Sequence, residues 1–293
     1  MRVVVAPSAG FCRGVRNAVA RARECAKCNA QCADFSAFSH QPSALVFTDG
    51  PLIHNPQMME MLGREGVLET DTPEGLPGGA TLMIRAHGIA PGRRAFLRSL
   101  PLRLVDATCP DVARIQSQIR AHARRGMDIV IYGDHGHAEV EGLLGFSEGR
   151  GHVVDSVAEV EKLDGAWTGG AACLVAQSTQ CPLAYAAVAE AARRRWPGVV
   201  VLDTICDATK NRQREVAQLA EACDALVVVG GHRSANTLRL VELARTFRPT
   251  FHIETASELR RGDFRAFHCA GLTGGASTPD FALDDARRAL ESF

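Results

Sequence analysis

Three cysteines recur along the chain at one constant interval, and cysteine thiolates are ligands for transition metals. Cys12, Cys109 and Cys206 lie 97 residues apart, and each follows an apolar run and precedes a stretch of helical periodicity. Thiolates at equivalent points of a repeat predict one shared metal centre. Zinc with an open fourth position and a [4Fe–4S] cluster with one iron lacking a protein ligand both fit three cysteines. The alternative is three half-buried thiols without any metal.

A second cysteine group competes for this interpretation. Cys25, Cys28 and Cys32 stand in the stretch ECAKCNAQCADF, with His40 nearby, and such spacing can bind metal. The stretch ends a predicted helix and enters a polar insertion, so exposed, oxidation-prone thiols are favoured over a second metal site. Three other cysteines lie in or beside apolar runs and are predicted to be small core residues: Cys173, Cys223 and Cys269.

Polar side chains follow several other strand-like runs. Together they supply many hydrogen-bond donors and few fixed charges, which suits an anion such as phosphate. Helix N-termini at the same turns would add backbone N–H groups. Any one of these histidines alone is more often structural, but the group lies at equivalent edges of the repeat. Its members are His54, His87, His137, Ser234, Asn236 and Ser277.

One carboxylate is well placed to deliver protons. Glu139 comes two residues after His137, and Glu141 is the rival in the same GHAEVEG stretch. The hydroxyl of Ser178 or Thr179, after another strand-like run, could relay a proton. The alternative for Glu139 is an ordinary solvated acid at a helix start, favoured by the helix dipole.

Strand-like and helical segments alternate along the chain, which predicts parallel sheets with helices packed on their faces. Helical periods follow each of the three spaced cysteines. In such α/β units, ligands gather where strand C-termini meet helix N-termini, and most of the polar residues above fall there. The predicted strands are 2–7, 44–48, 81–86, 102–107, 128–133, 172–177, 198–203, 225–231 and 268–274.

The repeat predicts three related α/β modules of ordinary domain size. The first, 1–107, holds the first cysteine of the repeat with His54 and His87; the second, 108–202, holds the next with His137 and Glu139. The third, 203–293, ends in a helix and holds the last cysteine with the serines and the asparagine. A pseudo-threefold arrangement would direct three cysteines at one central point.

Composition narrows the class of protein. The 293 residues have zero formal net charge and are 5% aromatic, which argues against a nucleic-acid or anionic-membrane partner. No apolar run is long enough to span a membrane. The N-terminus MRVVVAPSAGF is not a convincing signal peptide. We therefore expect a cytoplasmic protein whose ten cysteines are free thiols or metal ligands rather than disulfides.

Taken together, these segments resemble the 4-hydroxy-3-methylbut-2-enyl diphosphate reductase family, which acts last in the methylerythritol phosphate route to isoprenoids. The matching stretches include GFCRGV, DATCPDV, GHAEVEG and DTICDATKNRQ, and they cover almost the whole chain in order. The full set spans residues 10–15, 52–55, 86–88, 106–112, 136–142, 203–213, 234–236 and 274–279.

The resemblance implies a trefoil of three α/β modules around a [4Fe–4S] cluster held by the three spaced cysteines. It implies an oxidoreductase that removes the allylic hydroxyl of the substrate with two electrons and two protons, yielding isopentenyl and dimethylallyl diphosphate. Ferredoxin or flavodoxin would supply the electrons. Glu139 would supply protons, with Ser178 beside it. The diphosphate-binding residues implied are His54, His87, His137, Ser178, Thr179, Ser234, Ala235, Asn236 and Ser277.

Three positions depart from the family pattern. Ser178 stands where a threonine is usual, Ala235 where a second serine is usual, and Ala138 where a proline is common. These departures leave open a divergent paralogue that acts on a related allylic diphosphate. From the cysteines alone, a three-cysteine zinc hydrolase and a non-catalytic iron–sulfur protein also remain alternatives.

Overall fold

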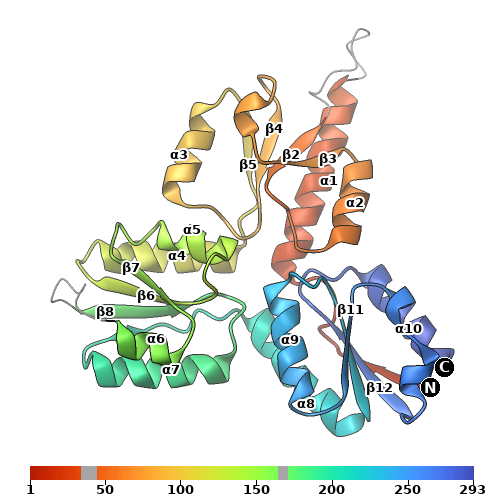
Figure 1. Ribbon diagram of the computed structural model, residues 1–293. Coiled ribbons are helices and arrows are strands. Elements are labelled where there is room, and N and C mark those ends of the chain that lie inside the picture. Colours follow the sequence, from red (N-terminus) through yellow and green to blue (C-terminus); the bar gives the residue numbers. More distant parts are fainter. Residues whose placement is uncertain (34–44, 164–170) are drawn as a thin grey trace. The chain divides into compact units, whose positions relative to one another are not determined.

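The computed structural model describes residues 1–33, 45–163 and 171–293 (Figure 1). The chain forms two compact units, and each is described by itself. One unit contains residues 1–16, 53–59 and 206–293, and the other contains residues 17–52 and 60–205. The polar insertion with His40 lies outside the described residues.

The strands form three four-stranded sheets, and every strand pairing is parallel. This confirms the predicted α/β class with three related sheets. The first sheet has the order β3-β2-β4-β5, from β2 (Val46–Asp49), β3 (Val67–Thr70), β4 (Thr81–Ile84) and β5 (Arg103–Asp106). The second has the order β7-β6-β8-β9, from β6 (Asp128–Tyr132), β7 (Gly151–Val154), β8 (Ala172–Ala176) and β9 (Val200–Val201). The third has the order β1-β12-β10-β11, from β1 (Arg2–Val5), β10 (Ala225–Val229), β11 (Thr250–Ile253) and β12 (Cys269–Gly274).

Helices connect the strands, and α3, α4 and α7 have proline in their first turn, where the missing N–H costs no helical hydrogen bond. No helix in the described part of the chain is both long and apolar enough to cross a membrane. The α-helices are α1 (Arg13–Ala33), α2 (Pro56–Arg64), α3 (Pro91–Ser99), α4 (Pro110–Ala123), α5 (Ala138–Leu144), α6 (Val157–Lys162), α7 (Pro182–Arg195), α8 (Asp207–Ala222), α9 (Ala235–Arg245) and α10 (Asp280–Glu291). Short 3₁₀ helices are η2 (Pro73–Gly75), η3 (Ala256–Glu258) and η4 (Arg261–Phe264).

Both faces of the second sheet are buried by helices. Figure 1 shows α4 and α5 on one face of this sheet and α6 and α7 on the other. In β6, Ile129 and Ile131 pack against α4 and α5, whereas Val130 and Tyr132 pack against α6 and α7. The third sheet is covered in the same way, by α10 on one face and by α8 and α9 on the other. Because neither face meets water, the central strands are continuous apolar runs, which the sequence showed clearly.

The N-terminal strand belongs to the third sheet rather than to the first. Residues 2–7 were expected in module 1–107, but β1 pairs with β12, from Arg2 beside Cys269 to Val5 beside Leu272. The first two sheets are each built from four consecutive strands of the chain. Read from its other edge, the third sheet has the order β11-β10-β12-β1, so β1 occupies the edge position that β5 and β9 occupy in the first two sheets. The repeat is therefore permuted across the termini. Each spaced cysteine comes soon after the fourth strand of a sheet, namely β1, β5 or β9.

Three strands were missing from the sequence prediction, and all three are sheet edges. β3, β7 and β11 have four residues each, of which only one is fully buried. A half-exposed edge strand needs no continuous apolar run, so its sequence resembles that of a loop.

The predicted core cysteines are buried: Cys173 is 0% exposed, and Cys223 and Cys269 are nearly as inaccessible. Burial raises the pKa of the Cys173 thiol to about 12. Only the thiolate reacts with maleimide. At pH 8, thiolate at Cys173 therefore amounts to roughly one part in 10⁴.

We expect maleimide to modify the exposed Cys28 on α1 at least ~100-fold faster than Cys173 in the native protein. In denaturant the two cysteines should react alike. Peptide mapping by mass spectrometry after timed labelling measures both rates. Rapid labelling of Cys173 without unfolding would contradict the packed core around β8.

Candidate functional site

A buried carboxylate is held at the start of α5, in the unit that contains residues 60–205. Glu139 is 2% exposed. The Ser178 backbone N–H donates to Oε1 of Glu139 at 2.7 Å, and the Ser178 hydroxyl donates to Oε2 at 2.8 Å. The structure thus brings together the two residues for which the sequence predicted proton chemistry. The rival Glu141 is exposed, so it lacks this environment.

The turn that carries Ser178 is fixed by a side chain that sequence reasoning did not single out. Gln177 at the end of β8 is fully buried. Its Oε1 accepts the Asp134 backbone N–H at 2.9 Å, and its Nε2 donates to the Thr179 hydroxyl at 3.1 Å. Gly133 completes this packing, since a Cβ there would lie 2.6 Å from Val140 and 3.0 Å from Oε1 of Gln177. The turn after β8 is therefore tied to the turn after β6.

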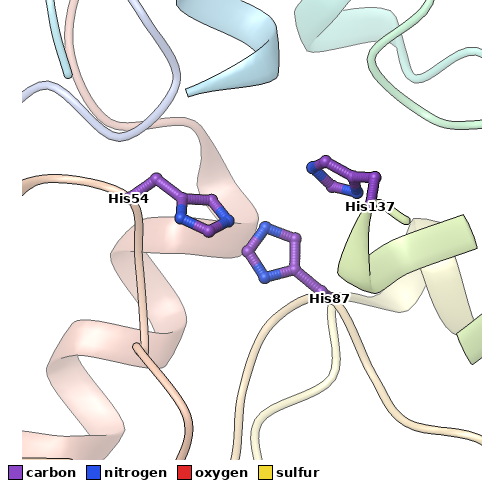
Figure 2. Close-up of side chains that lie close together, drawn as sticks. All are labelled: His54, His87 and His137. Atoms are coloured by element: carbon purple, nitrogen blue, oxygen red, sulfur yellow. The ribbon is translucent and has the colours of Figure 1, made fainter. Parts of the chain in front are cut away.

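Two of the predicted histidines meet in this unit. His137 stands at the start of α5, and His87 lies on the loop after β4 (Figure 2). Their rings are edge-to-face, with centroids 5.6 Å apart. The His137 Nδ1 accepts the backbone N–H of Glu139 at 3.1 Å, which leaves Nε2 to carry the ring proton when the imidazole is neutral. His54, also labelled in Figure 2, belongs to the other unit.

The His87 loop depends on a glycine. Gly88 has φ +69°, and a Cβ there would lie 2.4 Å from the Gln116 amide nitrogen. Side chains rarely adopt this backbone conformation, so only glycine fits without strain. The backbone of Gly88 also packs against Gly142 of α5. This contact holds the loop with His87 beside the helix that begins after His137.

The other unit contains His54 and the hydroxyl and amide donors. Asn55 caps α2, because its side-chain oxygen accepts the Met58 backbone N–H at 2.8 Å. The His54 carbonyl accepts the Ser277 hydroxyl at 3.3 Å. A Cβ on Gly231 would lie 2.7 Å from that same carbonyl oxygen. The segment before α2 is therefore packed against the turns that follow β10 and β12.

The start of α9 presents a buried donor that finds no acceptor in the described part of the chain. Ser234 caps the helix by accepting the Thr237 N–H, and Ala235 follows it. Asn236 is 6% exposed, and within the described residues its Nδ2 has no hydrogen-bond partner. A buried N–H left unpaired costs about 1–3 kcal/mol, so a bound acceptor at this point would be stabilising. An anionic oxygen is such an acceptor.

The three spaced cysteines all stand directly before helices, and none of the described cysteines forms a disulfide. Cys12 and Cys206 belong to the unit with the third sheet, and Cys109 belongs to the other. The Val15 N–H approaches the Cys12 Sγ at 3.4 Å, and the Thr209 hydroxyl lies 3.1 Å from the Cys206 Sγ. Helix N-termini and hydrogen bonds to sulfur both favour thiolates and are used around iron–sulfur clusters. This donor set fits a soft metal or a cluster.

The second cysteine group lies on the long helix α1. Cys25 is half-buried and Cys28 is exposed on α1. The side chain of Cys32 lies outside the described residues, and both the second metal site and the exposed, oxidation-prone thiols stay predictions.

Replacement of Asn236 by Ala is expected to raise KM for an anionic substrate roughly tenfold to a hundredfold, the effect of losing one hydrogen bond to a charged group. The stability of the protein should change little, since Nδ2 has no acceptor to lose among the residues that the structure describes. Steady-state kinetics and thermal unfolding measure the two effects separately. An unchanged KM would exclude Asn236 from substrate binding.

Comparisons with known proteins agree on one relationship. Residues 3–291 match the family described as LytB protein. A curated 4-hydroxy-3-methylbut-2-enyl diphosphate reductase from Opitutus terrae is 43% identical, and one from Solidesulfovibrio magneticus is 40% identical; both alignments cover all of both chains.

Two solved structures are also similar. The E-1-hydroxy-2-methyl-but-2-enyl-4-diphosphate reductase from Plasmodium falciparum superposes with a TM-score of 0.87 at 26% identity, over 97% of this chain and 86% of that one. A structure of (E)-4-hydroxy-3-methyl-but-2-enyl diphosphate reductase, the terminal enzyme of the non-mevalonate pathway, gives 0.71 at 34% identity over the full length of both.

Proposed function

Because the chain belongs to the LytB family, we propose that it is an oxidoreductase acting on 4-hydroxy-3-methylbut-2-enyl diphosphate. The reaction removes the allylic hydroxyl as water, with two electrons and two protons, and yields isopentenyl and dimethylallyl diphosphate. The observation that carries the proposal is the 43% identity over the full length of a reductase of that name.

The cofactor proposed is a [4Fe–4S] cluster held by Cys12, Cys109 and Cys206. Support comes from their position at helix starts, their freedom from disulfides and the hydrogen bonds to two of the sulfurs. Such a cluster would supply electrons and, at an iron without a protein ligand, a Lewis acid for the substrate oxygen. The reductase relatives favour this cofactor over the zinc hydrolase alternative.

The protein's donors would bind and orient the diphosphate. The unpartnered Nδ2 of Asn236 supports this role in the unit with the third sheet, where Ser234, Ala235, Ser277 and His54 lie on the adjoining turns. In the other unit, His87 and His137 meet and Thr179 follows Ser178. Fixing the non-reacting end of a substrate places its reacting carbon without a further entropy cost in the chemical step.

Glu139 is proposed to hold and deliver the protons, with Ser178 as its positioning partner. Each carboxylate oxygen already accepts one hydrogen bond from Ser178, so the carboxyl group has one fixed orientation. A proton on either oxygen could pass to the substrate directly or through the Ser178 hydroxyl. Burial of the pair keeps bulk water from competing for that proton.

The departure at position 178 is compatible with the same reaction. Ser178 contacts Glu139 through its N–H and its hydroxyl, both of which a threonine shares. Serine at this position therefore retains both hydrogen bonds and loses only the restriction on its rotamer.

The electron donor proposed is ferredoxin or flavodoxin, and the location proposed is the cytoplasm.

Anaerobic purification with iron and sulfide analysis tests the cofactor, and reduction of the candidate diphosphate by a chemical electron donor tests the reaction. We expect about four iron and four sulfide per chain and both C5 diphosphates as products. A colourless, zinc-containing protein would refute the cofactor. A fully loaded cluster without turnover of this diphosphate would refute the substrate.

A further inference from the structure

A buried arginine links the two cysteine-bearing turns of the unit with the third sheet. Arg212 of α8 is 2% exposed. Its Nη2 donates to the Gly10 carbonyl at 2.6 Å, two residues before Cys12. Its Nη1 donates to the Ala208 carbonyl at 3.1 Å, two residues after Cys206. One guanidinium therefore connects the loop before α1 with the first turn of α8.

Arg212 forms no ion pair with a carboxylate in the part of the chain that the structure describes, and its Nε has no hydrogen-bond partner there. Burial lowers the pKa of the guanidinium, and negative charge on Cys12, then Cys206, then Glu215 opposes that effect. As thiolates, Cys12 and Cys206 would therefore offset the cost of burying this cation more than Glu215 does.

A purely structural link between two carbonyl groups would not need a cation. Burying a charge without an opposite charge costs free energy, and a neutral donor could hold the same carbonyls. The cost is offset if a negative centre is bound beside the guanidinium. Two thiolates of a metal centre would supply that charge.

We propose that Arg212 is a positioning residue whose fixed charge raises the reduction potential of the metal centre bound by Cys12 and Cys206. This proposal rests on the proposed [4Fe–4S] cofactor. Accepting an electron makes a thiolate-bound cluster more negative by one charge, and a nearby cation in a medium of low dielectric constant stabilises that state. The two hydrogen bonds of Arg212 would also keep both cysteine turns in place during reduction.

The test is a redox titration of the loaded protein without substrate, followed by electron paramagnetic resonance. Arg212→Gln removes the charge and keeps one amide donor. At a fixed solution potential, we expect its ratio of reduced to oxidised cluster to fall about tenfold, a shift of about 59 mV for one electron. Arg212→Lys keeps the charge and should shift the ratio less than about threefold.

Arg214→Gln is the matched control, because Arg214 lies exposed on the same helix and the change of net charge is identical. It should leave the midpoint unchanged. A loaded Arg212→Gln protein with the wild-type midpoint would overturn the proposal.

If the Arg212→Gln protein cannot hold a cluster, the Arg212→Lys protein tests whether the charge at this position is needed. A loaded lysine variant near the wild-type midpoint supports the charge role, whereas loss of the cluster from both variants overturns it. Failure of the cofactor proposal has a separate signature, since the wild-type protein itself would then contain no iron.

Discussion

Replacement of Glu139 by Gln should lower kcat by roughly 10²–10⁴-fold, the usual contribution of a general acid or base. Glutamine is close in size, its oxygen can still accept the Ser178 N–H, and its amide NH2 can donate to the Ser178 hydroxyl oxygen, so the local fold should persist. It cannot deliver a proton. KM should change little, and the cluster spectrum should remain.

Single-turnover and steady-state assays with a chemical electron donor measure this effect. The control is Glu141→Gln, an exposed carboxylate on the same helix, which should retain near-normal kcat. Normal turnover by Glu139→Gln would remove Glu139 as the proton donor. Absence of turnover by the wild-type protein and by both variants, with the cluster present, would instead favour a non-catalytic iron–sulfur protein.

Replacement of Cys109 by Ser should remove or degrade the cluster and abolish activity. A serine hydroxyl is a poor ligand for iron compared with a thiolate, and two remaining cysteines would have to hold the whole centre. Iron and sulfide analysis with visible absorbance measures the loss directly, without depending on the activity assay.

Cys181 provides a matched control for this variant. Both cysteines are half-buried, both cap a helix that begins with proline, and both belong to the same unit. Cys181→Ser should keep a full complement of iron because Cys181 is outside the proposed ligand set. Equal iron content in the Cys109→Ser and wild-type proteins would contradict the assignment of Cys109.

The sequence could predict the central strands and the cysteine repeat because both leave a local signal. Continuous apolar runs marked β6, β8, β10 and β12, whereas the half-exposed edges β3, β7 and β11 did not. The pairing of β1 with β12 left no local mark either. This pairing depends on which free sheet edge the strand meets, and residues 2–7 alone do not indicate with which of the three sheets they pair.

The candidate site likewise has parts that the sequence could predict and parts that it could not. Types and spacing pointed to Glu139 and Ser178, but only the structure shows one residue donating to both carboxylate oxygens. Gln177 and Arg212 escaped notice because a glutamine or arginine in a polar stretch looks solvated. Their burial is decided by partners far along the chain, such as the Gly10 carbonyl that accepts from Arg212.

The strand at the N-terminus has a consequence for biosynthesis. Arg2 and Cys269 are neighbours in the third sheet although 267 positions separate them in the sequence. β1 can therefore pair only after β12 has been synthesised, and closing so long a loop is slow. The Cys12 backbone N–H donates to the Ala276 carbonyl after β12, so the turn with Cys12 gains its final support only once that segment has been made. We therefore expect iron and sulfide to be inserted after β12 has left the ribosome.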